Sequence, residues 1–240
     1  MTVHSVNYSE DLLRAEYHKR EPIRKALQMV KQKYDVQDWD IVELGSGLGH
    51  NLTIFSQKNR VTGVEGLKAA AEEASARGTP TISVDLQDKI PLESGSFDLV
   101  LCLDVLEHLV DPARCLAEAH RLLRENGLLV LNVPNHFSLS GRLNIALGSG
   151  IDSIKLFPEF DDWKNPHVRF FRHSSITKLL QERQFKIDAD WSSFFPSIPL
   201  ANKLPGLISS RFGRSLARWT PELFAGGFFL ISRKLGIGGK

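Results

Sequence analysis

The sequence predicts an α/β fold with a Rossmann-like, doubly wound, mainly parallel sheet of seven strands, helices on both faces and long insertions in the last third of the chain. Strand and helix patterns alternate from about residue 40 to residue 135. Several strand patterns end in glycine or an acid, and 240 residues suffice for one such domain. We therefore expect a single domain over residues 1–240, with ligands at the carboxyl ends of the strands.

The expected strands are short apolar segments, and the fourth is apolar on both faces, as a central parallel strand should be. They comprise residues 40–45, 60–66, 81–85, 97–105, 127–135, 185–191 and 225–234. The expected helices have start and stop signals, such as Pro112 at a start and Gly78 at an end. They comprise residues 9–34, in which Pro22 opens a second helix, and residues 52–58, 68–78, 112–127 and 175–185.

The composition excludes several classes of protein. A net charge of +2 argues against a nucleic-acid-binding protein, and 42% hydrophobic residues is ordinary for a globular chain. The polar N-terminus has no apolar signal core, and no apolar run is long enough to span a bilayer. We expect a cytoplasmic protein in which Cys102 and Cys115 are reduced packing residues. No spacing typical of a metal site is present, so no metal is expected.

The segment Ile41–His50, IVELGSGLGH, has three glycines at alternate positions directly after a strand. Such a turn brings a ligand close to the main chain. A P-loop requires Lys and then Ser or Thr after the last glycine, whereas His50 and Asn51 follow here. His50 also occupies the position of the third glycine of a dinucleotide-binding turn, which weakens a dehydrogenase interpretation without excluding it.

Acidic residues near this turn narrow the choice of ligand. Glu65 ends the second strand about 20 residues after the turn, where a carboxylate can accept hydrogen bonds from both hydroxyls of a ribose. Glu43 lies two residues before Gly45, where it would repel a pyrophosphate but suits an ammonium group. S-adenosylmethionine carries adenosine at one end, an ammonium group at the other and no phosphate.

ELGSGLG resembles the first motif of the class I S-adenosylmethionine-dependent methyltransferases, in which E/D-x-G-x-G-x-G is typical. VTGVEG and SVDLQD are similar to the second and third motifs, in the same order. SGSFDLVLCLDVLEHLVDP and LLRENGLLVLNVPN resemble the small-molecule branch that includes the ubiquinone-pathway O-methyltransferases. The resemblance covers roughly residues 40–135. It implies a Rossmann-like fold, S-adenosyl-L-methionine as the cofactor and S-adenosyl-L-homocysteine as the product.

The resemblance also implies a set of cofactor-binding residues. It assigns the ribose to Glu65, the adenine amino group to Asp85 and the face of the adenine ring to the backbone of Leu86. The whole set follows the first strands of the sheet and comprises Glu43, Gly45, Gly47, Gly49, Glu65, Gly66, Asp85, Leu86 and Leu103. For the glycines the alternative is a tight turn without a ligand, and for Glu65 and Asp85 it is an ordinary exposed acid.

His108 in DVLEHL and His167 in NPHVRFF are the candidate catalytic residues. Methyl transfer to a hydroxyl requires removal of a proton, and histidine is the commonest base near neutral pH. The alternative for His108 is a role in ordering its loop, and the alternative for His167 is a structural turn. His136 is a third candidate. Three further candidates lie in the N-terminal segment and are more typical of a helix surface: Tyr8, Tyr17 and His18.

The chain divides into a cofactor-binding core, residues 39–136, with an N-terminal helical lid, residues 1–38, and acceptor-side insertions, residues 137–170 and 192–227. Within the last insertion, residues 204–219 have apolar side chains at helical spacing and arginines on another face. This pattern indicates a helix that covers the acceptor pocket or contacts a second subunit in a homodimer. The alternative is peripheral contact with anionic lipid.

We expect an enzyme that transfers a methyl group from S-adenosylmethionine to a small-molecule acceptor, such as a hydroxyl of a phenol, quinol or sugar. One alternative is N-methylation of a small amine or peptide terminus. Another is a non-catalytic module that binds S-adenosylmethionine. No nucleic acid is expected as a partner.

Overall fold

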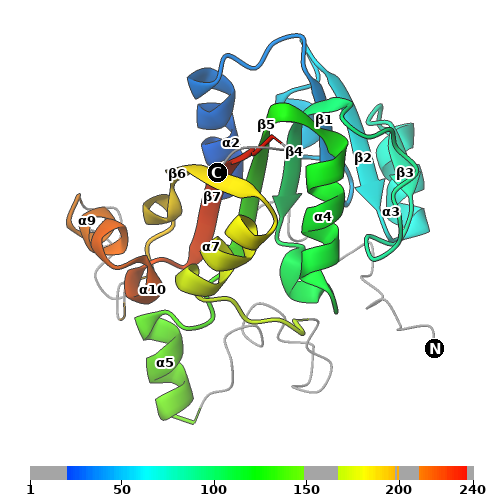
Figure 1. Ribbon diagram of the computed structural model, residues 1–240. Coiled ribbons are helices and arrows are strands. Elements are labelled where there is room, and N and C mark those ends of the chain that lie inside the picture. Colours follow the sequence, from blue (N-terminus) through cyan, green and yellow to red (C-terminus); the bar gives the residue numbers. More distant parts are fainter. Residues whose placement is uncertain (1–20, 149–166, 198, 200–210, 237–240) are drawn as a thin grey trace. The chain divides into compact units, whose positions relative to one another are not determined.

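The computed structural model describes residues 21–148, 167–197, 199 and 211–236 (Figure 1). Its contacts divide the chain into two compact units. The first unit comprises the described residues up to Leu103, with Arg114–Val130 and the residues from Lys234 onward. The second unit comprises Asp104–Ala113 and Leu131–Arg233. Each unit therefore combines segments that are distant in the sequence.

The predicted seven-stranded α/β sheet is confirmed, with the strand order β3-β2-β1-β4-β5-β7-β6 (Figure 1). The strands are β1 (Asp40–Leu44), β2 (Arg60–Glu65), β3 (Thr81–Ser83), β4 (Phe97–Leu103), β5 (Leu123–Pro134), β6 (Phe185–Asp190) and β7 (Gly227–Lys234). Strand β1 pairs in parallel with β2 on one side and with β4 on the other. The strand order therefore reverses at β1, which is the position where open α/β sheets bind ligands.

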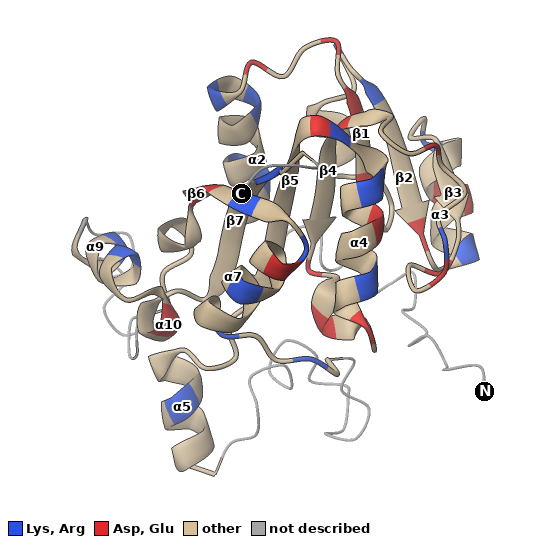
Figure 2. Ribbon diagram, in the orientation of Figure 1, with Lys and Arg blue, Asp and Glu red and all other residues tan. Residues whose placement is uncertain are grey.

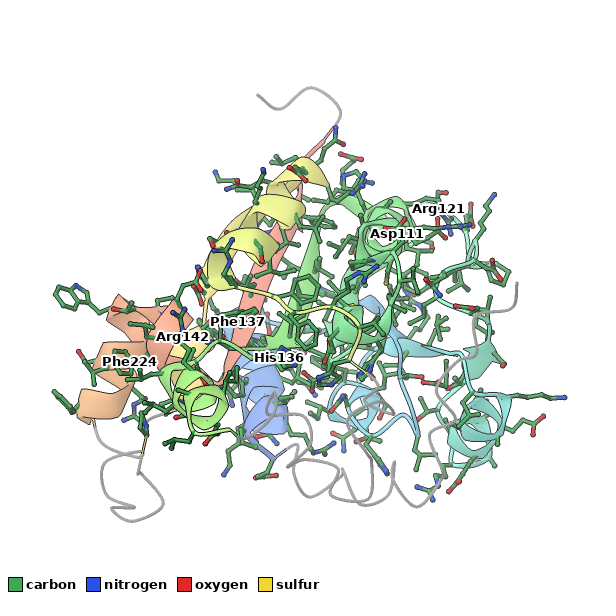
Figure 3. The ribbon with its side chains drawn as sticks, turned by 90° about the horizontal axis from the view of Figure 1, so that it is seen from below. Asp111, Arg121, His136, Phe137, Arg142 and Phe224 are labelled. Atoms are coloured by element: carbon green, nitrogen blue, oxygen red, sulfur yellow. The ribbon has the colours of Figure 1, made fainter. Side chains whose placement is uncertain are left out.

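Helices cover both faces of the sheet in the first unit. Helix α4 (Pro112–Leu122) lies on one face, whereas α2 (Glu21–Lys33) and α3 (Lys68–Ala76) lie on the other, as Figures 1 and 3 agree. Helix α2 buries a stripe spaced at i, i+3, i+4 and i+7, namely Ile23, Ala26, Leu27 and Val30. Because β4 is covered on both sides, its residues Leu99–Leu103 are all buried. Cys102 and Cys115 are free and buried, as expected of packing residues.

The second unit contains the last two strands and several short helices. The helices are α5 (Leu139–Ala146), α7 (His173–Glu182), α9 (Arg211–Trp219) and α10 (Pro221–Phe224). Helix α7 buries Ile176 and Leu180. Strand β7 is almost wholly buried along its length, which explains its apolar sequence. The unit also contains two 3-10 turns, η2 (Leu106–His108), which follows β4, and η4 (Ser192–Phe194), which follows β6.

The expected helix over residues 52–58 is wrong. Only one 3-10 turn, η1 (Leu52–Ile54), forms there. The side-chain amide of Asn59 donates to the Phe55 carbonyl at 2.8 Å and to the Val36 carbonyl at 3.3 Å. The Phe55 carbonyl also accepts a hydrogen bond from Lys58 N at 3.4 Å, so the segment closes in a turn, and β2 begins at Arg60.

The expected helix over residues 112–127 begins at Pro112 but ends earlier than predicted, at Leu122. The carbonyls of Arg121 and Leu122 accept hydrogen bonds from Gly95 N and Ser96 N, at 2.9 and 3.0 Å. These carbonyls are thus unavailable to continue the helix, and the chain enters β5 at Leu123. Asn126 of β5 has a left-handed backbone, at φ 63°.

Several expectations concern residues outside the described ranges. Tyr8, Tyr17 and His18 of the expected lid lie there, as do residues 149–166 of one insertion and residues 200–210 of the other. Residues 21–33 of the expected lid form α2. Among the described helices, none combines the length and apolar character needed to cross a bilayer.

Candidate functional site

The turn after β1 has the left-handed backbone that its glycines allow. Gly45, Gly47 and Gly49 have φ values of 74°, 52° and 76°, a region that side chains disfavour. Gly45 N and Ser46 N both donate to the Val64 carbonyl, at 2.8 and 3.1 Å. The turn is therefore fixed to the end of β2, with main-chain groups close to the carboxyl edge of the sheet.

Glu65 is the residue that orders this turn. Its Oε2 accepts a hydrogen bond from Gly47 N at 2.8 Å, and its Oε1 accepts one from Leu67 N at 2.9 Å. A carboxylate oxygen can accept two hydrogen bonds, so each oxygen retains capacity for a ligand hydroxyl. The sequence indicated Glu65 as a ribose ligand but gave no sign of this structural contact.

Glu43 is buried, with an exposed fraction of 1%. Its Oε1 accepts a hydrogen bond from the side-chain amide of Asn51 at 2.7 Å, and Asn51 is itself buried. The pair links the middle of β1 to the start of η1, across the glycine turn. The expected contact between Glu43 and an ammonium group stays a prediction.

The glycines differ in whether the surrounding structure leaves room for a side chain. A Cβ at Gly49 would lie 2.8 Å from Thr79 Cγ2, so this position is closed by packing within the unit. A Cβ at Gly66 would meet nothing within 4 Å, and the residue is exposed. Gly63, which the sequence argument did not single out, is closed in the same way by Thr81 and Ser46.

The register of the sheet places the predicted cofactor residues at one edge. Leu44 pairs with Val64 of β2 and with Cys102 of β4. The next residues along these neighbouring strands are therefore Gly45, Glu65 and Leu103, all from the predicted set. In parallel strands the carboxyl ends share an edge, so tertiary structure brings these three positions together.

The third strand adds Asp85 and Leu86 to this edge. Glu65 pairs with Ser83, and Val84 N donates to the Glu65 carbonyl at 3.0 Å. Asp85 is exposed, and its Oδ1 accepts a hydrogen bond from Gln87 N at 2.9 Å. Leu86 is buried, with an exposed fraction of 7%. Asp85 is thus held in a turn with its carboxylate accessible to a ligand.

Histidines from three distant segments meet in the second unit. His136 Nε2 lies 2.8 Å from His167 Nδ1, and the rings of His108 and His167 are 4.8 Å apart in an edge-to-face arrangement. The main chain explains this meeting, because Val168 N and Arg169 N donate to the Glu107 carbonyl at 2.8 and 3.0 Å. The segment that contains His167 is thereby fixed against η2, which carries His108.

Burial keeps two of these imidazoles neutral. Desolvation, with a smaller contribution from His108, lowers the pKa of His136 to about 4. Desolvation, with contributions from His108 and His136, lowers the pKa of His167 to about 3. In the 2.8 Å contact between these rings, one nitrogen must therefore donate a proton and the other accept it.

His136 is positioned by the turn after β5. Asn135 Nδ2 donates to the carbonyls of Ala225 and Glu222, at 2.8 and 3.0 Å, and Asn135 Oδ1 accepts from Phe137 N. Arg142 Nε of α5 donates to the Phe137 carbonyl at 2.8 Å (Figure 3). From the sequence His136 is only a third candidate, and its partner His167 lies on a distant segment.

Glu107 is the member of this cluster that the sequence argument missed. It is buried, with an exposed fraction of 1%, and its Oε1 lies 4.0 Å from His108 Nε2. Donor atoms of Glu107, His108 and His167 all lie within 4.8 Å of one another. The first two are adjacent in the sequence and His167 is remote, so no linear spacing could indicate the group.

Comparison with known proteins identifies the family. A family described as a methyltransferase domain matches residues 12–189. A Mycobacterium tuberculosis protein named probable S-adenosylmethionine-dependent methyltransferase is 29% identical over 196 residues, covering 78% of this chain and 65% of that protein. A ubiquinone biosynthesis O-methyltransferase of Colwellia psychrerythraea is 28% identical over 184 residues, covering 70% of this chain and 69% of that protein.

The first curated relatives are longer proteins, of which the chain spans 29%, 52% and 65% of the length. Among solved structures, an S-adenosylmethionine-dependent methyltransferase from Thermotoga maritima superimposes with a TM-score of 0.62. The match covers 96% of this chain and all of the other at 20% identity, and so supports the fold. The family match over most of the chain, together with the glycine turn, shows that this chain belongs to the class I S-adenosylmethionine-dependent methyltransferases.

Proposed function

We propose that the protein transfers a methyl group from S-adenosylmethionine to a hydroxyl of a small molecule. The observation that carries this proposal is the contact between Glu65 and the glycine turn, in which the carboxylate fixes Gly47 N and keeps capacity for a ribose. Family membership implies this cofactor. When bound, it supplies a methyl group on a sulfonium, which a nucleophile attacks in line.

The described residues fit such a cofactor. The turn carries no side chain at Gly45 or Gly47, so the main chain can approach an amino-acid moiety closely. Glu65 receives the ribose hydroxyls, and Gly66 beside it leaves open space. Asp85, whose carboxylate is exposed, receives the adenine amino group, and the backbones of Leu86 and Leu103 border the ring. Glu43 contributes negative charge near the ammonium group.

We propose that His108 and His167 both serve the acceptor hydroxyl, His108 as the base and His167 by holding its neighbours. The side chain of His108 is 21% exposed, so a ligand can reach its ring. His167 is buried against His136, which favours a role in holding its neighbours over a direct role as base. The name of the Colwellia psychrerythraea relative, an O-methyltransferase, supports a hydroxyl acceptor over an amine. N-methylation, which needs no base when the amine arrives neutral, is the second candidate.

Contact of residues 204–219 with a membrane or with a second subunit also belongs to the proposal. Helix α9 lies within this range and carries basic but no acidic residues (Figure 2). The exposed fractions of Phe212 and Trp219 on this helix are 61% and 90%. An exposed aromatic pair beside arginines suits either partner. Co-sedimentation with anionic vesicles tests the membrane contact, and analytical ultracentrifugation without lipid tests the homodimer.

The test is release of S-adenosylhomocysteine from the full chain in the presence of phenols, quinols, sugars or amines. We expect release with a hydroxyl acceptor, and slower release by the Glu65→Ala variant when the concentration of S-adenosylmethionine is limiting. Release with amines alone would replace O-methylation by N-methylation. Binding of S-adenosylmethionine without turnover on any acceptor would instead support a non-catalytic binding module.

A further inference from the structure

Glu107, His108 and His167 form a set of potential metal donors in the second unit. Their nearest donor atoms lie within 4.8 Å of one another, and the Glu107–His108 pair is at 4.0 Å. Ligands at ~2.0–2.2 Å from one ion lie roughly 3–3.6 Å apart. Side-chain rotations that move each donor atom by about 1 Å would therefore let all three donors bind one cation.

The composition of the set selects the class of cation. Two imidazoles and one carboxylate are the protein donors of many zinc and non-haem iron sites, which leave further coordination positions open. Mg²⁺ and Ca²⁺ prefer sites made of oxygen donors. The set therefore suits a divalent first-row transition ion.

His136 supports this arrangement as an outer partner. In metal sites a ligating histidine commonly uses its second ring nitrogen in a hydrogen bond that fixes the orientation of the ring. His167 Nδ1 makes such a contact, 2.8 Å from His136 Nε2, so a cation would be ligated through His167 Nε2. His136 is itself held, since Phe170 packs edge-to-face on its ring at 4.9 Å and Asn135 fixes the preceding turn.

The main chain also fixes the spacing between the two parts of the set. The Glu107 carbonyl accepts hydrogen bonds from both Val168 N and Arg169 N, directly after His167. Glu107 and His108 are in η2, whose main chain is thereby tied to the remote histidine. The donors are thus presented by a connected scaffold rather than by independent loops.

We propose that Glu107, His108 and His167 bind a divalent transition-metal ion, with His136 as a positioning residue for His167. The proposal goes beyond methyl transfer and does not depend on it.

The test is a titration of the chelator-treated full chain with Co²⁺, followed by visible absorption, and with Zn²⁺, followed by calorimetry. We expect one ion per chain and a cobalt spectrum of nitrogen and oxygen donors without thiolate charge-transfer bands. Glu107→Gln, which keeps the shape of the side chain, and His108→Ala should each weaken binding by more than ~100-fold. His136→Phe should weaken it by ~10–100-fold, as loss of an outer partner does.

His173→Gln is the matched control, because His173 lies in the same unit but pairs with Asp190 at 2.6 Å. This variant should bind Co²⁺ like the wild type. Thermal unfolding of each chelator-treated variant checks that it folds. Wild-type protein without stoichiometric Co²⁺ or Zn²⁺ binding would overturn the proposal, as would equal affinity in the folded Glu107→Gln and wild-type proteins. Equal affinity for Mg²⁺ and Co²⁺ would also overturn it.

The outcome is separable from that of the proposed function. Methyl transfer by chelator-treated protein that binds no metal would leave the proposed function intact and remove the metal site. Stoichiometric cobalt binding, together with no methyl transfer by the chelator-treated protein on any acceptor, would do the reverse.

Discussion

Glu65 joins two tasks in one carboxylate. It holds Gly47 N and Leu67 N at 2.8 and 2.9 Å, and we propose that it also binds the ribose. A substitution at Glu65 therefore removes a ligand contact and loosens the turn that presents the main chain. A sequence motif indicates the first effect, but only the folded turn reveals the second.

We expect Glu65→Ala to weaken S-adenosylhomocysteine binding by about 1–3 kcal/mol, because polar groups lose their buried partner. Calorimetry on the full chain measures the dissociation constant. Glu72→Ala is the control, since Glu72 is an exposed acid of α3 in a surface pair with Lys68 and should leave the affinity unchanged. An unaltered dissociation constant in Glu65→Ala would refute the ribose role.

Gly49 and Gly78 offer a matched pair of left-handed glycines, with φ values of 76° and 90°. A Cβ at Gly49 would meet Thr79 at 2.8 Å, whereas one at Gly78 would meet nothing within 4 Å. Gly78→Ala should cost about 1 kcal/mol of unfolding free energy from backbone strain alone. Gly49→Ala should cost about 2–4 kcal/mol, because overpacking adds to that strain. Equal losses in urea unfolding would show that the contact with Thr79 is unimportant.

At the scale of elements, charged side chains join the amino ends of the strands in the first unit. Asp40 of β1 accepts hydrogen bonds from Arg60 of β2 and Arg124 of β5, each at 2.8 Å to Oδ2. Arg124 also pairs with Asp98 of β4. This network lies at the ends of the strands opposite to the glycine turn, so its contribution is to stability rather than to ligand binding.

The network predicts a pH-dependent contribution to stability. The hydrogen bond from Arg60 holds the pKa of Asp40 at about 2, below its ordinary value of 3.8. Since the pKa is lowered in the folded state, the stabilisation is present above pH 3.8 and is lost as the pH falls towards 2. We expect Asp40→Asn to lower the free energy of unfolding by only about 1 kcal/mol at pH 7. The loss is small because solvent screens the arginines.

Urea unfolding at several pH values measures the difference in unfolding free energy between the wild type and Asp40→Asn. It should be constant between pH 5 and pH 7, within about 0.3 kcal/mol, and shrink below about pH 4. A difference that stayed the same down to the lowest accessible pH would mean that the ion pairs are not its source.

At the scale of the whole molecule, ligand binding should be visible as stabilisation. A ligand at 100 times its dissociation constant adds about 2.7 kcal/mol to the unfolding free energy. For a chain of this size that corresponds to a rise in melting temperature of roughly 5–10 °C. We expect S-adenosylhomocysteine to give such a rise in a thermal unfolding experiment, and a clearly smaller rise in Glu65→Ala at the same concentration, because its affinity is lower.

NAD is the control ligand in that experiment. His50 at the third-glycine position and buried Glu43 before the turn both disfavour a dinucleotide. NAD should therefore leave the melting temperature unchanged. A rise with NAD and none with S-adenosylhomocysteine would favour the dehydrogenase interpretation over methyl transfer.

The sequence by itself determined the α/β class, the seven strands and the glycine turn with Glu65 at the next strand end. These features depend on local apolar patterns and on motifs that are continuous in the chain. Two helices were predicted too long from the sequence, at places where other groups form hydrogen bonds with their carbonyls. After η1 the chain closes in a turn whose Phe55 carbonyl accepts from both Lys58 N and the Asn59 side chain, and main-chain donors at Gly95 and Ser96 bind the last carbonyls of α4.

Tertiary structure alone decided how the turn is held and which histidines meet. Glu65 reaches Gly47 because β1 and β2 are parallel neighbours, a pairing that places their carboxyl ends at one edge. His167 joins Glu107 and His108 through hydrogen bonds between main-chain segments far apart in the sequence. Such contacts depend on the register of remote segments and on burial, and neither is encoded in any local spacing of residues.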